Sequence, residues 1–463
     1  MNSHDRQSPA LLWQQGQIVE LDITDVSNGG DGVGRFEGRA VFVPSTVTGD
    51  RIRARLVRVK PQYAHGKLIE LLKSSSHRIR PRCIVADKCG GCQWQHINDE
   101  YQRVAKRRYI LEILKRIGGF AEPTVAPPLH RDVLNYRNKA TYPLNLSSTG
   151  QVQAGYYRRG SHRLVNLNQC PVQDTRFDPL LAQVKRDIER RGWSIYNEQT
   201  HQGQLRHFSL RIGRRTGEML LTLISTDWHL PELEHQAQQW MQRYPQLVGV
   251  ALNYNPQRTN VIVGKQTRAI AGQLELREIF ADLEFRLRPE TFFQINTETA
   301  EALLEVIVEQ LDLQGEETVL DAYCGIGTFA LPLARRVQQV IGIEVQAAAV
   351  QQAHINAQLN NIANVSFQTG AVEDLLPQLE VSPDIVLLDP PRQGCNHQTL
   401  DALLKSKPPR LVYVSCNPAT LARDLKLLCQ NSSYSLIFVQ PADFFPQTAH
   451  AECAAFLGSA EIL

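Results

Sequence analysis

Two residues near the C-terminus have side chains that could act as a nucleophile and as a proton acceptor. Cys416 follows an apolar segment and precedes an Asn-Pro pair, and Glu452 ends a His-Ala-Glu sequence just before a last predicted strand. A thiolate can add to an electron-poor carbon, and a carboxylate within hydrogen-bond reach can later remove a proton so that the thiolate leaves. The pair therefore predicts covalent catalysis, although a free cysteine is more often a small buried hydrophobic residue. We expect that buried role for Cys324, Cys395, Cys429 and Cys453.

A glycine-rich turn follows a predicted strand that contains Asp321. The turn reads Tyr-Cys-Gly-Ile-Gly-Thr over residues 323–328, and its glycines let the backbone pass close to a ligand at a helix N-terminus. Glu344 ends the next predicted strand, 23 residues after Asp321, where an acid typically accepts hydrogen bonds from ribose hydroxyls. The third glycine of the dinucleotide pattern G-x-G-x-x-G is absent, which argues against a nicotinamide cofactor. A strand-end acid followed by C-G-x-G-T instead resembles the first motif of class I methyltransferases, which bind S-adenosyl-L-methionine.

A third predicted strand ends at Asp389, which is followed by two prolines and Arg392. Ligands of open α/β sheets bind at the carboxyl ends of the strands, so Asp389 is a further candidate for the cofactor site. Methyltransferases that act on exocyclic amines usually have an aromatic residue after the Pro-Pro pair, where it stacks on the base. Arg392 stands there in this chain, which counts against amine methylation and for a different base chemistry.

These candidates need an order of elements that brings several strand ends together. Residues 297–311 have apolar side chains at helical spacing, and apolar strands then alternate with helical stretches. The predicted strands cover 318–322, 339–344, 384–389, 411–415, 435–440 and 454–457. This alternation predicts a doubly wound parallel sheet in a C-terminal α/β domain, Rossmann-like and of the class I methyltransferase kind, over residues 291–463.

The N-terminal third is strongly basic, although the whole chain has a formal net charge of only +3. Residues 51–82 hold ten Lys or Arg against one acid, and a second basic run covers 103–116, which suits binding to a polyanion. Within 51–59, basic and apolar residues alternate with a period of two, as in a half-buried strand. Together with a glycine-rich turn and the sequence Ala-Val-Phe-Val-Pro at 40–44, this segment resembles the TRAM domain, an RNA-binding β-barrel of the OB-fold kind. We expect this barrel over residues 10–73.

Four further cysteines have the spacing of a metal or cluster site. Three follow a C-x5-C-x2-C pattern and the fourth precedes a proline after 77 more residues: Cys83, Cys89, Cys92 and Cys170. Zinc usually takes paired C-x-x-C motifs, whereas iron–sulfur clusters often take three close cysteines and a remote one before a proline. The spacing by itself leaves both sites open. These residues fall in a predicted central α+β domain over 74–290, which includes a predicted helix at 101–117.

Three longer segments resemble motifs of the RNA uracil-C5 methyltransferase family. They read Ser-Cys-Asn-Pro-Ala-Thr-Leu-Ala-Arg-Asp at 415–424, Phe-Pro-Gln-Thr-Ala-His-Ala-Glu at 445–452 and Phe-Phe-Gln-Ile-Asn at 292–296. The resemblance implies that Cys416 is the nucleophile and Glu452 the proton acceptor. It also implies S-adenosyl-L-methionine contacts at Gln294, Tyr323, Gly325, Thr328, Glu344, Ala371 and Asp389. Thr328 stands where relatives often have Asn, and Ala371 could reach the cofactor only through its backbone.

The resemblance also identifies the base on which such a thiolate would act. Carbon 5 of uracil is a poor nucleophile until a thiolate adds to carbon 6 and turns the base into an enolate. Carbon 5 can then take the methyl group of the sulfonium, after which a base removes the C5 proton and the thiolate leaves. Because the target base must leave its stack to reach Cys416, we expect an RNA loop or an opened helix as the substrate.

The four-cysteine pattern resembles the [4Fe–4S] signature of the subfamily that methylates a uracil in bacterial 23S ribosomal RNA. Transfer-RNA-specific relatives typically lack both this cluster and the N-terminal barrel. The resemblance therefore implies 23S ribosomal RNA as the partner and the four cysteines as cluster ligands. One alternative is a transfer-RNA or cytosine-C5 methyltransferase on the same frame. Another is a non-catalytic iron–sulfur RNA-binding protein, which the presence of both Cys416 and Glu452 opposes.

Neither a membrane span nor a signal peptide is evident in the chain. It has no run of ~18 or more apolar residues, and its first fifteen residues are polar. Nine cysteines without an export signal argue against disulfides. We expect a cytoplasmic protein with no membrane partner, and the sequence predicts no protein partner.

Overall fold

The computed structural model describes residues 13–430 and 432–459, which form two compact units. The first unit consists of the residues up to Asp87 together with Cys92–Ala105 and Gln447–Ala449. The second unit consists of Lys88–Gly91, Lys106–Pro446 and His450–Leu463. In the part of the chain that is described, no helix has the length and apolar character needed to span a membrane.

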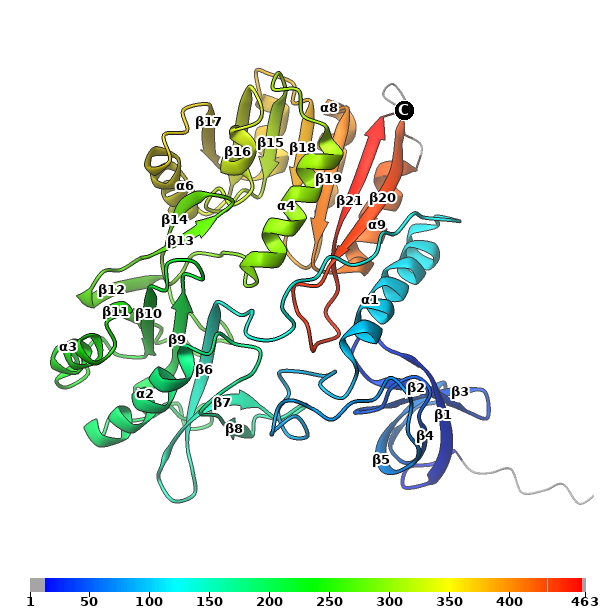
Figure 1. Cartoon of the computed structure of the whole chain (residues 1–463), viewed down its shortest axis with the longest axis vertical. Helices are drawn as coiled ribbons and strands as arrows, with labels where there is room; N and C mark the ends of the chain where they lie inside the picture. Colours follow the sequence, from blue (N-terminus) through cyan, green and yellow to red (C-terminus); the bar gives the residue numbers. More distant parts are fainter. Residues whose placement is uncertain (1–12, 431, 460–463) are drawn as a thin grey trace, which may run out of the picture. The chain divides into compact units, whose positions relative to one another are not determined.

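The first unit contains a closed five-stranded barrel, as the resemblance to a TRAM domain predicts (Figure 1). Its strands are β1 (Ile18–Val26), β2 (Gly32–Phe36), β3 (Arg39–Val43), β4 (Arg51–Val59) and β5 (Tyr63–Lys73), joined in the order β1-β2-β3-β5-β4. The alternation of β4 is confirmed, because Ile52, Ala54 and Leu56 are buried while the arginines before each of them are exposed. The positive charge of the exposed arginines on β4 is partly neutralised, because Oε1 of Glu20 on β1 lies 3.0 Å from Nε of Arg53.

The helix predicted at 101–117 is present, but its boundaries and its last turn differ. α1 spans Asp99–Ile113, and the chain continues as a π-helical turn over Leu114–Gly118. Gly119 then adopts a left-handed conformation with a φ of 77° and donates its N–H to the carbonyl of Leu114, which ends the helix. A single π turn changes the hydrogen-bond partners without interrupting the helical pattern, so the sequence spacing did not reveal it.

The second unit begins with a mixed seven-stranded central sheet. Its strands in spatial order are β12 (Gln266–Gly272), β11 (Leu247–Tyr254), β10 (Met219–Ser225), β9 (Leu205–Ile212), β6 (Lys139–Leu146), β7 (Val152–Tyr157) and β8 (Leu164–Asn166). β10 and β11 are parallel, and the other neighbouring strands are antiparallel. Helices α2 (Phe177–Arg191) and α3 (Leu233–Arg243) each bury an apolar stripe at helical spacing. A hairpin of β13 (Leu276–Phe280) and β14 (Leu283–Leu287) follows.

A second seven-stranded sheet occupies the C-terminal part of the same unit. Its strands in spatial order are β17 (Val365–Thr369), β16 (Gln339–Glu344), β15 (Thr318–Ala322), β18 (Ile385–Leu388), β19 (Arg410–Ser415), β21 (Glu452–Ser459) and β20 (Tyr434–Ala442). The prediction of an entirely parallel sheet is wrong at one edge, because β21 pairs antiparallel with both β19 and β20. The sequence analysis also missed β17, a short edge strand with polar residues at alternate positions.

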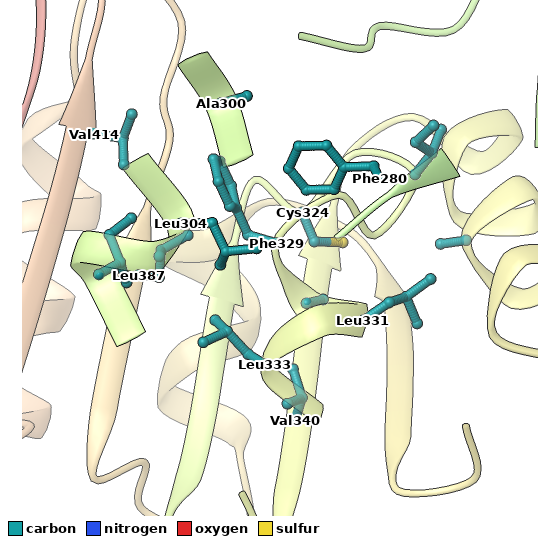
Figure 2. Packing of buried hydrophobic residues seen from close by; sticks show 14 of the residues in the cluster. Phe280, Ala300, Leu304, Cys324, Phe329, Leu331, Leu333, Val340, Leu387 and Val414 are labelled. Carbon is teal, nitrogen blue, oxygen red and sulfur yellow. The ribbon is translucent and has the colours of Figure 1, made fainter. Parts of the chain in front are cut away.

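Helices cover both faces of this C-terminal sheet, as a doubly wound fold requires. They are α4 (Thr297–Leu311), α5 (Ala330–Ala334) and α6 (Ala347–Leu359) in one core cluster, and α7 (Val372–Leu375), α8 (His397–Ser406) and α9 (Pro418–Cys429) in the other. Successive residues of one strand join different clusters, as Val319 and Leu320 do. Figure 2 shows Phe329, just after the glycine turn, packed among the residues of the first cluster near Leu304 of α4 and Leu387 of β18.

Candidate active site

The five parallel strands of the C-terminal sheet each bring one predicted segment to the same edge. The glycine turn follows β15, Glu344 ends β16, Ala371 lies just after β17, Asp389 follows β18 and Cys416 follows β19. The carboxyl ends of parallel strands form the ligand crevice in open α/β sheets. Residues spread over about a hundred positions of sequence are therefore gathered in one part of the second unit.

The glycine turn has a backbone that only a few residue types adopt without strain. Gly325 and Gly327 have φ angles of 56° and 87°, and Tyr323 also has a positive φ of 72°. A side chain added at Gly325 would meet no protein atom within 4 Å, so the backbone there faces open space. Gly325 donates its N–H to Oε2 of Glu344 at 3.2 Å, and Gln346 donates to Oε1 at 2.8 Å. The carboxylate is thereby held against the turn.

Asp321 is a site residue to which the sequence analysis gave no role of its own. It lies at the end of β15, is only 1% exposed, and neither carboxyl oxygen has a hydrogen-bond partner within the described chain. Burial, followed by the nearby Asp389, raises the pKa of this carboxyl well above its usual range. A buried polar group without a partner marks a place for a ligand donor. The strand-end acid in the methyltransferase motif was the signal that could have identified it.

Gln294 and Asp389 come together from distant parts of the sequence. Nε2 of Gln294 lies 3.5 Å from Oδ2 of Asp389, and the backbone carbonyl of Gln294 accepts a hydrogen bond from Nδ2 of Asn138 at 2.8 Å. Burial raises the pKa of Asp389 to about 7. An amide and a carboxyl at the sheet edge, with the glycine turn and Glu344, form a donor and acceptor set that fits S-adenosyl-L-methionine, which carries an amino group, a carboxylate and ribose hydroxyls.

The register of β19 and β21 relates Cys416 to Glu452. The pairs run in antiparallel order from Arg410 opposite Gly458 to Ser415 opposite Cys453. Cys416 directly follows the last residue of β19, and Glu452 is the first residue of β21. Both therefore lie next to the last pair of this ladder, Ser415 and Cys453. The two candidate residues are therefore neighbours at the strand ends, although 35 residues separate them in sequence.

Burial and charge shift the pKa values of both residues upward. Burial, followed by the negative charge of Glu452, raises the pKa of the Cys416 thiol, while Arg392 acts in the opposite direction. Burial, followed by Asp389, raises the pKa of Glu452 to about 8, against the opposing effect of Lys106 and Arg392. A negative charge on Glu452 therefore disfavours the thiolate of Cys416.

Arg392 is a cation that acts on both residues of this pair, and the sequence analysis noted it only as a departure from other methyltransferases. Its guanidinium donates to Nε2 of His450 at 2.9 Å. Its backbone carbonyl accepts hydrogen bonds from Nδ2 of Asn417 at 3.1 Å and from Oγ1 of Thr420 at 3.2 Å. Burial and then Arg392 lower the pKa of His450, so that the ring is neutral and acts here as an acceptor. The loop after β18 is therefore tied to the start of α9 beside Cys416.

A buried ion pair supports the segment that leads to Glu452. Nζ of Lys106 lies 2.6 Å from Oδ1 of Asp443 and 2.9 Å from the carbonyl oxygen of Phe445, and both charged side chains are about 2–3% exposed. Lys106 belongs to the second basic run, which we expected to face a polyanion, and for this residue that expectation is wrong. Charge counts along a sequence do not reveal a buried partner 337 residues away.

The remaining predicted residues are less closely tied to the sheet edge. Thr328 is buried just before α5, and the carbonyl of Ala371 accepts the N–H groups of Asp374 and Leu375 in the first turn of α7. Cys324, Cys395 and Cys453 are buried as expected, whereas Cys429 is only half-buried.

The predicted cluster cysteines are divided between the two units. Cys83 and Cys92 belong to the first unit, and Cys89 and Cys170 belong to the second. Among the residues described by the structure, no group of three or more His, Cys, Asp or Glu is arranged to hold a metal ion. The iron–sulfur cluster therefore stays a prediction from the sequence.

Comparison with known proteins agrees with this geometry. Residues 215–460 match the family described as tRNA (uracil-5-)-methyltransferase, and residues 12–69 match the TRAM domain. The chain belongs to the RNA uracil-5-methyltransferase family. Members of this family use S-adenosyl-L-methionine to methylate carbon 5 of uracil in RNA, and the TRAM match adds an RNA-binding domain to the N-terminal part of the chain.

Several relatives are similar to this chain over nearly their whole length. A protein of Nostoc sp. named an uncharacterized RNA methyltransferase is 65% identical over 96% of this chain and 97% of its own length. A protein of Bacillus cereus with the same name is 37% identical over 97% of this chain and 98% of its own. The solved structure of Pyrococcus abyssi tRNA (uracil-54, C5)-methyltransferase with S-adenosyl-L-homocysteine is 29% identical, with a TM-score of 0.76, and covers 95% of this chain and 100% of that one.

The buried ion pair of Lys106 and Asp443 generates a stability prediction. Lys106→Met should lower the free energy of unfolding by about 3–5 kcal/mol, because the carboxylate of Asp443 would stay buried without its cation. Lys106→Met combined with Asp443→Leu should recover much of that loss. Urea denaturation of the full chain measures both. Arg116→Ala is the matched control, because Arg116 pairs with Glu112 in an exposed i,i+4 pair that should contribute below about 1 kcal/mol. A double variant as unstable as the single one would contradict this account.

Proposed function

We propose that this protein forms 5-methyluridine in 23S ribosomal RNA, with Cys416 as the nucleophile and Glu452 as the proton acceptor. The observation that carries this proposal is the antiparallel pairing of β19 with β21, in which Cys416 directly follows β19 and Glu452 begins β21. A thiol and a carboxyl in this relation are what addition to carbon 6 and proton removal from carbon 5 require. The three-domain division at residues 10–73, 74–290 and 291–463 belongs to the same proposal.

The reaction starts from the thiolate of Cys416. Its electron pair forms a bond to carbon 6 of uracil, and the electrons of the C5–C6 double bond move towards O4 to give an enolate. Carbon 5 of that enolate then attacks an electrophilic methyl group, which S-adenosyl-L-methionine supplies when bound. Arg392 opposes the rise in the pKa of Cys416 that burial causes, and so favours the thiolate that begins the sequence.

Removal of the C5 proton completes the reaction. Glu452 takes this proton, the C5–C6 double bond forms again, and the Cys416 thiolate leaves carbon 6. A carboxyl whose pKa is raised to about 8 is a stronger base than an exposed glutamate once it has ionised.

The cofactor is proposed to lie along the edge formed by β15, β16, β17 and β18. Glu344 is positioned for ribose hydroxyls, and the backbone at Gly325 and Ala371 for close approach. The other proposed contacts are Gln294, Tyr323, Thr328 and Asp389. The carboxyl of Asp321, which has no partner in the described chain, is added to this set as an acceptor for a donor group of the ligand.

Transfer RNA is the second candidate substrate, and one observation favours it. The solved structure of the Pyrococcus abyssi tRNA (uracil-54, C5)-methyltransferase covers 95% of this chain. An N-terminal barrel therefore does not by itself separate ribosomal from transfer-RNA enzymes, which weakens one argument made from the sequence. The C-x5-C-x2-C pattern is the feature that still favours ribosomal RNA.

We propose a [4Fe–4S] cluster at Cys83, Cys89, Cys92 and Cys170, separate from the chemistry at Cys416. Gly91 donates its N–H to the sulfur of Cys89 at 3.4 Å, and hydrogen bonds of this kind stabilise cluster thiolates. The uracil reaction needs no electron transfer, so the cluster would have a structural or RNA-positioning role.

RNA containing 5-fluorouridine tests the nucleophile and the substrate together. Fluorine at carbon 5 cannot leave as a proton does, so the protein should form a stable covalent adduct in the presence of S-adenosyl-L-methionine, seen as a shifted band on denaturing gels. Cys416→Ala should abolish the adduct, and Cys429→Ala, a half-buried cysteine outside the site, should retain it. A 23S fragment and a transfer-RNA transcript are compared. An adduct with transfer RNA alone overturns the ribosomal substrate, and no adduct with either overturns the proposed reaction.

Glu452→Gln should let a covalent complex accumulate on ordinary RNA, because the C5 proton would have no acceptor. In the unchanged protein, breakdown of the complex should quicken by roughly tenfold per pH unit below the pKa of Glu452 and level off above it. The breakdown rate should rise with pH because the pKa of Glu452 is about 8, and the neutral carboxyl that dominates at lower pH cannot accept a proton. Rapid-quench measurements over pH 6–9 supply the profile. Turnover of Glu452→Gln at the normal rate would remove this residue from its role.

Anaerobic purification tests the cluster independently of catalysis. Iron and acid-labile sulfide should be present in equal amounts, with the broad visible absorbance of an iron–sulfur cluster, and Cys83→Ser or Cys170→Ser should lower all three. Cys429→Ser is the matched control and should change none of them. Zinc without sulfide would instead establish the zinc site that the cysteine spacing left open.

A further inference from the structure

A polar pocket lies in the central part of the second unit, on elements that carry none of the candidate catalytic residues. Its cavity volume is about 290 Å³, at the lower end of the range for small-molecule sites. β6, β7 and β9 contribute to its lining, together with the turn that follows Ile195. Its lining residues include Tyr157, His162, Tyr196, Glu198, Arg206 and His207.

His207 is the strongest sign that the pocket is built for a ligand. It is 8% exposed, and its Nδ1 has no hydrogen-bond partner among the described residues. Burial lowers the pKa of His207 to about 4, so its ring is neutral near pH 7. A buried polar atom without a partner normally has a water or a ligand to satisfy it. The neutral ring makes an uncharged ligand group the better partner.

Aromatic rings form the walls around this histidine. Tyr157 and His162 have ring centroids 5.4 Å apart, and the guanidinium of Arg206 lies 4.9 Å from the centroid of the Tyr196 ring. Arg206 itself is fixed by hydrogen bonds to the carbonyls of Gln257 at 2.7 Å and Thr259 at 3.0 Å. Flat π surfaces held in place in this way suit the stacking of a planar, aromatic ligand.

The turn that contributes His162 to the pocket is basic. The turn between β7 and β8 reads Arg-Arg-Gly-Ser-His-Arg over residues 158–163, with all six residues exposed and none acidic. It is closed by the N–H of Arg158, which donates to the carbonyl of Arg163 at 2.8 Å. Exposed arginines beside aromatic walls are the combination with which proteins bind the phosphates and bases of single-stranded nucleic acid.

We propose that this pocket binds one unstacked base of the RNA, other than the base that is methylated. Glu198 decides the kind of base. Its carboxyl lies 3.5 Å from Nδ1 of His162 at the pocket, and a carboxylate accepts hydrogen bonds from an exocyclic amino group. Adenine, cytosine and guanine carry such a group, whereas uracil offers only its N3–H, which is flanked by two carbonyl oxygens that a carboxylate repels. The pocket therefore discriminates against uracil and gives the protein a second point of recognition on its substrate.

This proposal rests on RNA being the substrate, as in the proposed function, but its test does not require methyl transfer. Fluorescence anisotropy of the full chain with labelled single-stranded ten-nucleotide oligo(A), oligo(C) and oligo(U) is measured at one salt concentration. The unchanged protein should bind oligo(A) and oligo(C) more tightly than oligo(U). Glu198→Gln should reduce that preference, and His162→Ala should raise the Kd of the preferred oligonucleotides by roughly five- to tenfold through loss of stacking.

The choice of variants keeps the result interpretable. The side chains of His162 and Glu198 are 86% and 53% exposed, so neither substitution removes a core residue. His207→Phe fills the pocket and should remove the same preference. His235→Ala, an exposed histidine on α3 outside the pocket, is the matched control and should bind as the unchanged protein does.

The outcomes separate this inference from the proposed function. Equal binding of the three oligonucleotides by the unchanged protein, or an unaltered preference in both Glu198→Gln and His162→Ala, overturns the second base site. The 5-fluorouridine adduct is measured on the same preparations. An adduct without a base preference overturns the pocket alone, and a preference without an adduct overturns the proposed chemistry alone.

Discussion

The antiparallel pairing of β19 with β21 is the constraint on which the candidate chemistry depends. A parallel strand ending at Cys416 would carry the thiol to the sheet edge without a base beside it. By running back along β19, β21 begins with Glu452 at the same edge, and the register from Ser415 and Cys453 fixes the two as neighbours. Because side chains alternate along a strand, a slip of one residue would turn Glu452 to the other face of the sheet. The hydrophobic residues of β21, buried along its length, hold that register.

Burial at this edge of the sheet disfavours the negatively charged forms of the acidic side chains and of the Cys416 thiol. Burial raises the pKa values of Asp321, Asp389, Glu452 and Cys416, so this edge of the sheet resists negative charge. Arg392 and Lys106 offset part of this effect at Glu452. A ligand that brings a positive sulfonium or hydrogen-bond donors would relieve it further, which couples cofactor binding to ionisation of the reacting groups. The loop tied by Asn417 and Thr420 keeps Arg392 in place for this purpose.

Recognition of RNA is distributed over parts of the fold that do not carry the chemistry. The barrel offers an exposed arginine row on β4, and the central sheet offers a basic turn beside a pocket with aromatic walls. Charge along the backbone gives affinity without sequence information, whereas a pocket for a single base adds discrimination. A uracil-modifying enzyme has many uracils to choose from in a long RNA. Contacts to bases other than the target are therefore a physically reasonable source of its selectivity.

The sequence by itself determined the parts of this protein that depend on local patterns. Period-two alternation identified β4, apolar spacing identified α4, and the glycine turn with Glu344 indicated a nucleoside-type cofactor edge. Only the tertiary structure decided the antiparallel edge of the C-terminal sheet, the burial of Lys106 against Asp443, and the unpartnered carboxyl of Asp321 and ring of His207. Such features arise between residues far apart in sequence, and burial depends on what packs around a residue. A local sequence pattern therefore predicts neither the distant contacts nor the burial of a residue.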